Sequence, residues 1–349
     1  MDDKRKVSAA VIVIAVFLLF CQAAARAQGM GLYKTMFFGY FDTMTGVSGY
    51  AKNEEEFHNQ AELLRQKLEH YHKLFDVYHT YDGINNLKTV NDAAAKQPVE
   101  VEPELISLLK FGKEMYQKTG GKINIAYGGV LSVWHEYREE GLEDPKRAEL
   151  PPEDLLASRA AHTDPDQIIL NETDGTVYIQ DPEVSIDVGS IGKGYAAQRL
   201  VEYAREIGLE YALFSLGGNV CTTGAKADGF PWHVGIENPD PDGSEAYVRS
   251  VGIWGGSLVT SGNYQRYYEV DGKRYCHIIN PDTGMPASYF PSVTVMAEDS
   301  GVADALSTAL FNMEFEEGLA FVESLDGVEA LWIFEDGGIR SSSGFVTYE

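Results

Sequence analysis

Cysteine is scarce in this sequence, since its 349 residues include only three. One of them, Cys21, lies in an apolar N-terminal stretch, which leaves Cys221 and Cys276 in the body of the chain. Two cysteines cannot provide the framework of a small disulfide-rich fold, so a hydrophobic core must hold a chain of this length together. The sequence leaves open whether these two form a disulfide or remain two buried thiols.

Basic residues are also few. Lys and Arg together number 28, against 53 Asp and Glu, and the formal net charge at pH 7 is −25. A chain of this charge is a poor partner for nucleic acids and for anionic membrane surfaces. A negatively charged ligand would need a local cluster of donors or a bound cation, so we expect any site for such a ligand to depend on a metal ion.

The sequence shows no hydrophobic run of the length that a membrane-spanning helix needs, because the apolar run Ala9–Phe20 is too short. This run follows Lys4, Arg5 and Lys6 and precedes Ala25-Arg26-Ala27, which fits the cleavage site of a secretory signal peptide. We therefore predict an exported protein, in the periplasm or at the extracytoplasmic face of the membrane. Residues 1–27 would be a cleaved signal peptide or a retained anchor, and residues 28–349 the functional domain.

The two commonest nucleotide-binding motifs are absent as well. The stretch SIDVGSIGKGYAAQ (Ser185–Gln198) passes from a strand-like segment through glycines into a helix, an arrangement that directs backbone N–H groups at phosphates. Gly194 follows Lys193, so the hydroxyl residue of a Walker A loop is missing, and the glycine spacing is not that of a Rossmann fingerprint. On its own, the stretch fits a phosphate site and the close packing of a helix equally well.

Hydrophobic periodicity predicts helices over Glu54–Tyr78, from Pro103 to the glycines at 120 and 121, from the glycines of the stretch above to Gly208, and over Val302–Met313. It predicts strands at Thr176–Gln180, Val184–Asp187, Tyr211–Leu216, Trp232–Glu237, Tyr267–Val270, Tyr275–Ile279, Val293–Met296 and Ala330–Phe334. Asp271-Gly272 and Asp336-Gly337 are typical of two-residue hairpin turns. Because the strands follow one another in runs, we predict an α+β fold with mixed, largely antiparallel sheets and packed helices. The acidic, proline-containing region 140–166 is expected to be a surface excursion.

Near the C-terminus, oxygen donors occur at a spacing that suits a hard metal ion. Asp304 and Thr308 are four residues apart on a predicted helix, with Ser307 beside them, so their side chains share one face. Mg²⁺ and Ca²⁺ prefer such ligands. Taken alone, the pattern is more often a helix that Asp304 caps or solvates. His277 has a similar alternative as a structural histidine, and Asn280–Gly284 (NPDTG) as a simple turn.

Five segments in a fixed order nevertheless resemble one family: DVGSIGKGYA, SLGGN, TSGNYQR, HIINPDTG and ADALSTALF. Together they are similar to the ApbE family of flavin transferases, from about Phe41 to the C-terminus. The resemblance implies an ApbE-like, T-fold-related domain that binds FAD as its substrate and uses Mg²⁺, with Ca²⁺ as a second option. It would attach FMN through a phosphoester bond to a Thr or Ser hydroxyl of an acceptor protein and release AMP.

By position, the resemblance implies a metal site at Ser190, Asp304, Ser307 and Thr308, with Ser190 contributing its backbone carbonyl. It implies contacts to FAD at Phe41, Tyr78, Ile123, Asn124, Asp187, Lys193 and Ile278. The candidate catalytic residues are His277 and Asp304. His277 is our first candidate for the general base, because a histidine titrates near neutral pH and this one borders Ile278.

Three other functions stay open at this stage. The same site with water as the acceptor would be an FAD pyrophosphatase that releases FMN and AMP. Asn124 and Asn280 stand where the family usually has Asp, so a non-catalytic flavin-binding protein is a second alternative. The third is an exported solute-binding protein, which would explain the N-terminal leader but not the ordered segments. For a transferase, we expect the acceptor to be a separate polypeptide, such as a subunit of a membrane redox complex, because this chain shows no flavinylation motif of its own.

Overall fold

The computed structural model describes residues 29–240, 242–243 and 245–348. The predicted signal peptide or anchor, residues 1–27, lies outside the described residues. Among the described residues, no helix combines the length and the apolar character that crossing a membrane requires.

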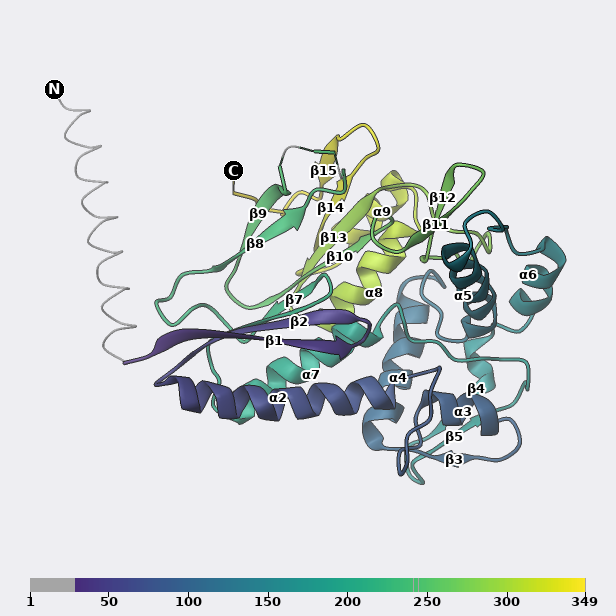
Figure 1. The fold of residues 1–349 in the computed structure, drawn as a ribbon, viewed down its shortest axis with the longest axis horizontal. Helices are drawn as coiled ribbons and strands as arrows, with labels where there is room; N and C mark the ends of the chain where they lie inside the picture. Colours follow the sequence, from purple (N-terminus) through teal and green to yellow (C-terminus); the bar gives the residue numbers. More distant parts are fainter. Residues whose placement is uncertain (1–28, 241, 244, 349) are drawn as a thin grey trace.

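An eight-stranded antiparallel sheet forms the centre of the molecule, in the order β1-β2-β6-β7-β10-β13-β14-β15 (Figure 1). Its strands are β1 (Gly31–Tyr40), β2 (Thr43–Ala51), β6 (Ala212–Leu216), β7 (Asn219–Thr222), β10 (Gly256–Gly262), β13 (Ser292–Ala297), β14 (Glu329–Ile333) and β15 (Ile339–Ser341). The α+β class and the antiparallel pairing predicted from the sequence are confirmed.

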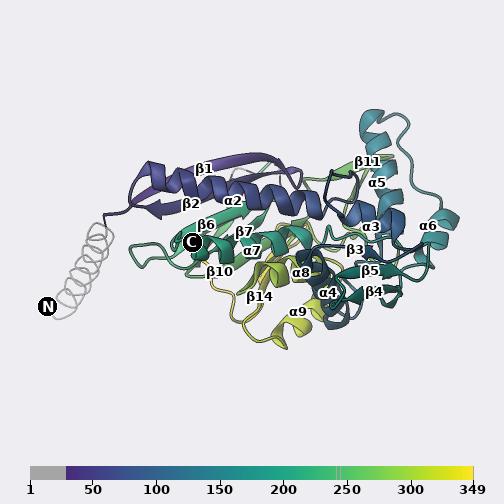
Figure 2. The same ribbon diagram turned by 90° about the horizontal axis from the view of Figure 1, so that it is seen from below.

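Helices cover one face of this sheet. They are α2 (Glu54–Leu74), α7 (Gly192–Glu206), α8 (Ser300–Phe311) and α9 (Phe315–Glu323), and Figure 2 shows α2 lying along β1 and β2. The apolar stripe of α2, including Phe57, Leu64 and Leu68, packs with Phe214 of β6 and Leu200 of α7 in one buried cluster. Asn53 and Asp299 cap α2 and α8 by accepting hydrogen bonds from the first turn of each helix.

A second lobe lies beyond the end of α2. It contains α3 (Leu87–Ala93), α4 (Pro103–Lys118), α5 (Gly128–Glu143), α6 (Glu153–Ala160), the 3₁₀ turn η1 (Pro165–Gln167) and a small sheet of β3 (Val99–Glu100), β5 (Thr176–Ile179) and β4 (Ile168–Asn171). This lobe shares the largest hydrophobic cluster with α8 and β13, so the two lobes have a continuous core.

Two hairpins complete the fold: β8 (Trp232–Glu237) with β9 (Tyr247–Ile253), and β11 (Tyr267–Val270) with β12 (Lys273–Cys276). Asp271 and Gly272 both have positive φ and join β11 to β12 in the expected two-residue turn. The two-residue turn predicted at Asp336-Gly337 is one residue too short. The N–H of Phe334 donates to the carbonyl of Gly338, so the loop between them has three residues.

Other predicted boundaries were wrong. Val184–Asp187 is not a strand, because its backbone bonds to the turn at residues 125–128 instead of a sheet. The strand predicted at Tyr275–Ile279 ends at Cys276, and the region 140–166 contains α6, whose Leu156 is buried. The hairpin of β1 and β2 was missed. Cys221 and Cys276 are both free thiols, so no disulfide links these two residues. Both are buried, and burial raises the pKa of their thiols to about 12 and about 11.

Candidate functional site

A cavity of about 1570 Å³ lies where the sheet, α5, α7 and α8 meet. Almost all the candidate site residues line it: Phe41, Tyr78, Ile123, Asn124, Asp187, Ser190, Lys193, His277, Ile278, Asp304 and Thr308. Ser307 is the exception, since it is fully buried in α8 behind the cavity wall. Segments that are far apart in the sequence therefore come together at one place, although their individual roles stay predictions.

Asp304 on α8 contacts the first turn of α7 directly. The N–H of Gly194 donates to Oδ2 of Asp304 at 2.7 Å, and Nζ of Lys193 lies 3.8 Å from Oδ1. A Cβ atom at position 194 would lie 2.3 Å from the Cβ of Asp304 and 2.3 Å from the carbonyl oxygen of Ser300. Glycine at this position therefore allows the approach of the two helices that sets the carboxylate beside the lysine.

The electrostatic environment of Asp304 favours a cation. Its side chain is almost completely buried, and burial raises the pKa of the carboxyl, while Lys193 and the hydrogen bond from Gly194 oppose that shift without cancelling it. Desolvation also raises the pKa of Asp187, against a 2.7 Å hydrogen bond from the N–H of Gly189. A buried and a partly buried carboxyl group, both with a raised pKa, are typical of a functional site.

Hydroxyl groups from β10 and α8 lie next to Asp304. The Oγ of Ser261 is 2.8 Å from that of Ser307 and 3.4 Å from Oγ1 of Thr308, and the Ser307 hydroxyl donates to the backbone carbonyl of Asp304. Over the described residues, no three His, Cys, Asp or Glu side chains form a metal cluster. One buried carboxylate with neighbouring hydroxyl and carbonyl oxygens still fits Mg²⁺, which usually keeps several waters and takes phosphate oxygens from a substrate.

His277 follows β12 immediately, not within a strand as predicted. Its backbone N–H donates to the carbonyl of Arg266 at 3.1 Å, and Nδ1 of the ring is 3.2 Å from the same oxygen, which fits a neutral ring protonated at Nδ1. Desolvation, together with the positive charges of Lys193, Arg266 and Arg138, lowers the pKa of His277 to about 3. The imidazole is therefore neutral at physiological pH and lies in a region of positive charge.

Phe41 and Asp42 form the turn of the first hairpin at the edge of the cavity. Both have positive φ, 52° and 50°, which non-glycine residues adopt at a cost of about 1 kcal/mol or more each. Two tethers hold this turn: the N–H of Phe41 donates to Nδ1 of His72 at 3.2 Å, and Arg266 donates to the carbonyl of Asp42 at 2.9 Å. Arg266 thus connects the turn to His277.

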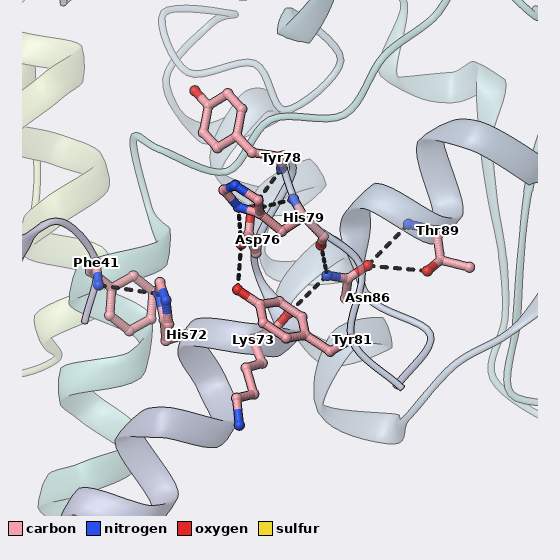
Figure 3. Close-up of polar contacts among 9 residues, drawn as sticks. All are labelled: Phe41, His72, Lys73, Asp76, Tyr78, His79, Tyr81, Asn86 and Thr89. Atoms are coloured by element: carbon pink, nitrogen blue, oxygen red, sulfur yellow. Dashed lines mark hydrogen bonds and ion pairs between the residues drawn. The ribbon is translucent and has the colours of Figure 1, made fainter. Parts of the chain in front are cut away.

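Tyr78 lies on the loop that follows α2, and Figure 3 shows how this loop is held. Oδ1 of Asp76 accepts the N–H groups of Tyr78 and His79 at 2.6 and 3.1 Å, and Oδ2 accepts the Tyr81 hydroxyl at 2.7 Å. Asn86 braces the same loop by donating to the carbonyl of His79 at 2.7 Å. The ring of Tyr78 is half exposed toward the cavity, and its backbone is fixed by Asp76.

The two asparagines that replace the usual aspartates are held by backbone groups. Asn124 donates to the carbonyl of Thr163 and accepts the N–H of Ala126, both at 2.8 Å. Asn280 is buried, accepts the N–H of Asp282 at 2.9 Å and so closes the predicted turn. A carboxylate could accept the same N–H groups, but it could not donate to the carbonyl of Thr163 as the amide of Asn124 does.

Sequence reasoning missed two residues of this site. Arg138 was not found, because the helix α5 that carries it was not predicted. Asp76 stands two residues before Tyr78, and an Asp in such a position commonly accepts the N–H of the second following residue. That local signal could have identified it.

Comparisons with known proteins agree with this geometry. Residues 41–332 match the model of the ApbE family. The chain is 35% identical to the FAD:protein FMN transferase of Klebsiella pneumoniae (strain 342), over 73% of this chain and 76% of the relative. It is also 35% identical to that of Treponema pallidum (strain Nichols), over 74% of each chain. The crystal structure of the ApbE protein of Thermotoga maritima has a TM-score of 0.79 and 28% identity, and the match covers 90% of this chain and 97% of that one.

Proposed function

The chain belongs to the ApbE family and is an FAD:protein FMN transferase, and we propose that its cavity transfers FMN from FAD to a Thr or Ser hydroxyl of a separate acceptor protein. The observation that carries this proposal is the contact of Asp304 with Lys193 and the N–H of Gly194 inside one large cavity. The carboxylate of Asp304, the lysine and the N-terminus of α7 lie close together, and this supports a site for a metal ion and a phosphate group.

The acceptor oxygen forms a bond to the phosphorus of the FMN half, the bond from that phosphorus to the bridging oxygen of the pyrophosphate breaks, and AMP leaves with this oxygen. The hydroxyl proton passes to a base. Phosphoryl transfer of this kind depends mainly on positioning and on neutralising charge.

Binding of the pyrophosphate is assigned to Lys193 and to the N-terminus of α7. The N-terminal end of a helix carries partial positive charge and attracts phosphate oxygens. This local charge is needed in a protein whose formal net charge is −25. Asp304 and Thr308, together with Ser307 and the backbone carbonyl of Ser190, would hold Mg²⁺ or Ca²⁺. When bound, the ion would offset the charge of the phosphates.

His277 is proposed as the base. With a pKa of about 3 it is a weak base in the described state, since proton transfer is most efficient when the pKa lies near the working pH. However, the positive charges of Lys193, Arg266 and Arg138 contribute to that low value. An anionic pyrophosphate would pair with such charges and so raise the pKa of His277. Asp304 is the second candidate for the base.

The flavin end of FAD is assigned to the α5 side of the cavity. Tyr78 offers a half-exposed ring there, and Ile123 and Ile278 offer buried apolar side chains. Asn124, Asp187 and Phe41 line the same cavity and complete the proposed contacts to FAD.

One experiment tests this proposal. The purified protein is incubated with FAD and Mg²⁺, with and without candidate acceptor proteins, and AMP release and acceptor mass are followed together. We expect an acceptor to gain the mass of FMN, and both EDTA and Asp304→Ala to abolish the gain. AMP release with no acceptor modified would favour the FAD pyrophosphatase, and FAD binding without AMP release would favour a flavin-binding protein.

The location is also a proposal. The basic residues, apolar run and Ala-Arg-Ala sequence within residues 1–27 support export to the periplasm or to the extracytoplasmic face of the membrane. An acceptor in a membrane redox complex would be accessible there. Cell fractionation with an antibody against the protein tests this, and recovery in the cytoplasmic fraction would contradict it.

A further inference from the structure

The cavity is larger than a pocket for one small molecule usually is. Ordinary ligand pockets measure roughly 300–1,000 Å³, against about 1570 Å³ here. Its lining continues from α5, past Lys193 and Asp304, to β8 and β9, and Figure 1 shows these two strands on the other side of α8 from α5. The end of the cavity near β8 is not needed for any contact assigned above.

This end is a groove, here called the outer groove, formed by Met44, Leu213, Val220 and Leu258 of the large sheet and by Gly235 and Tyr247 of the β8–β9 hairpin. In the sheet, Leu258 lies opposite Val220, and Val220 lies opposite Ser215, so these three side chains share one face. The neighbouring Phe214 packs with α2 and α7, so this shared face is turned away from these helices. Met44 and Tyr247 are 52% and 63% exposed. The groove is therefore accessible, and its apolar side chains lie beside His233 and Glu237 of β8, which also line the cavity.

The β8 strand offers main-chain groups to the groove. In the described part of the chain, β8 pairs only with β9, and Gly235 lines the cavity through its backbone because it has no side chain. A Cβ atom at position 235 would lie 2.5 Å from the ring of Tyr247, so the glycine lets this ring lie across the strand. An exposed strand edge with an aromatic side chain beside it is the usual receptor for an extended peptide.

The groove and the proposed reaction centre line one continuous cavity at the end of the sheet. Along β10, Leu258 is followed on the same face by Thr260, which also lines the cavity, and the next residue, Ser261, contacts Ser307 and Thr308. Two residues of a strand span roughly 7 Å. Thr260 lies on the groove face, whereas Ser261 points to the face covered by α8. The turn at Gly217 and Gly218 lines the same cavity at this end of the sheet, so a peptide in the groove can bring a hydroxyl group past this turn toward Thr308 and Asp304.

Resting on the proposed transferase function, we propose that the outer groove binds the acceptor protein, as an extended segment with apolar side chains over Met44 and Val220 and main-chain hydrogen bonds to β8. The transfer reaction requires a second protein at this centre, and the groove is an accessible continuation of the same cavity. Because Glu237 ends β8 in a strongly acidic chain, the segment is expected to carry few acidic residues near its Thr or Ser.

The test uses a short peptide around the hydroxyl that gains FMN in the experiment above. The variants are Met44→Glu and Tyr247→Ala, and Met36→Glu is the matched control, because Met36 belongs to the same hairpin, is 59% exposed and does not line the cavity. We expect the KM for the peptide to rise about tenfold or more in Met44→Glu and Tyr247→Ala, more than the Kd for FAD rises, and to stay at the wild-type value in Met36→Glu.

Any other outcome would reject the assignment of the outer groove to the acceptor protein. An unchanged KM for the peptide, in variants that still transfer FMN, would overturn the assignment and leave the transferase function intact. A raised Kd for FAD with an unchanged KM for the peptide would assign the groove to the adenosine half of FAD instead. If the unmodified enzyme transfers FMN to no acceptor, the proposed function fails, and this inference fails with it.

Discussion

Gly194→Ala is expected to separate α7 from α8 and to weaken both folding and the proposed metal site. The new Cβ would lie 2.3 Å from the Cβ of Asp304 and 2.3 Å from the carbonyl oxygen of Ser300. An unstrained contact is about 3.4 Å or longer, so the two helices must move apart by about 1 Å. The obstacles are backbone and a Cβ atom, which cannot rotate away as the end of a flexible side chain can.

Two opposing effects set the magnitude. Alanine is favoured over glycine inside a helix by about 0.5–1 kcal/mol. Overpacking in a well-packed interior costs about 1–3 kcal/mol and sometimes more. We therefore expect Gly194→Ala to lower the free energy of unfolding by about 1–2 kcal/mol, and also to weaken Mg²⁺-dependent binding of FAD, because the carboxylate of Asp304 loses its hydrogen bond from residue 194.

The assay is urea unfolding, with FAD titration in the presence of Mg²⁺. For the unfolding measurement, Gly192→Ala is the matched control, since it lies on the same turn of α7 and its Cβ would come no closer than 3.4 Å to Val188, an ordinary contact. Its stability should stay within about 0.5 kcal/mol of the wild type. If Gly194→Ala is as stable as Gly192→Ala, the close packing of α7 on α8 has been misjudged.

Three further predictions concern charges. Asp76→Ala should lower the free energy of unfolding by about 1–3 kcal/mol at neutral pH, since it leaves the N–H groups of Tyr78 and His79 without their acceptor. Burial alone would raise the pKa of Asp76, but hydrogen bonds from its neighbours lower this pKa overall. The stabilisation by Asp76 is therefore present above about pH 4 and is lost as the pH falls through the lowered pKa of the folded state. Equal acid sensitivity of wild type and variant would refute this. The folded pKa of His277 is about 3, which is below its unfolded value. Between about pH 6.5 and pH 3 the unfolded chain therefore binds a proton that the folded chain excludes, so the free energy of unfolding decreases as the pH is lowered. In urea unfolding, His277→Gln should lose less stability from pH 7 to pH 5 than the wild type, and an equal loss would contradict the assignment. Lys193→Met should weaken FAD binding about tenfold or more in isothermal titration, and unchanged affinity would remove this lysine from the phosphate site.

The fold class was predictable because the strands and turns follow local rules. Asp271-Gly272 occupies a turn in which both residues have positive φ, and Trp232–Glu237 is a strand with the predicted bounds. The first hairpin was missed because β1 has apolar side chains on both faces: Tyr33 and Phe37 pack toward α2, while Leu32, Met36 and Phe38 are exposed. Without alternation of apolar and polar residues, the period of two that identifies a strand is absent.

Val184–Asp187 shows the opposite error. Its buried side chains alternate with more accessible ones as in a strand, yet its backbone bonds to residues 125 and 128 and to the side chain of Asn91. Side-chain periodicity reports which residues are buried. It does not report what the backbone pairs with, and that choice depends on residues far away in the sequence.

The glycine-rich stretch that opens α7 was compatible with a phosphate site or with close packing, and the structure shows why these readings do not exclude each other. Gly194 packs against α8, and the same contact turns its N–H toward Asp304 and leaves Lys193 facing the cavity. The spacing of Asp304 and Thr308 was visible in the sequence, but their partner lies 110 residues earlier, where only tertiary structure could connect them. Because one glycine controls both the packing and the position of the carboxylate, stability and FAD binding should change together in Gly194→Ala.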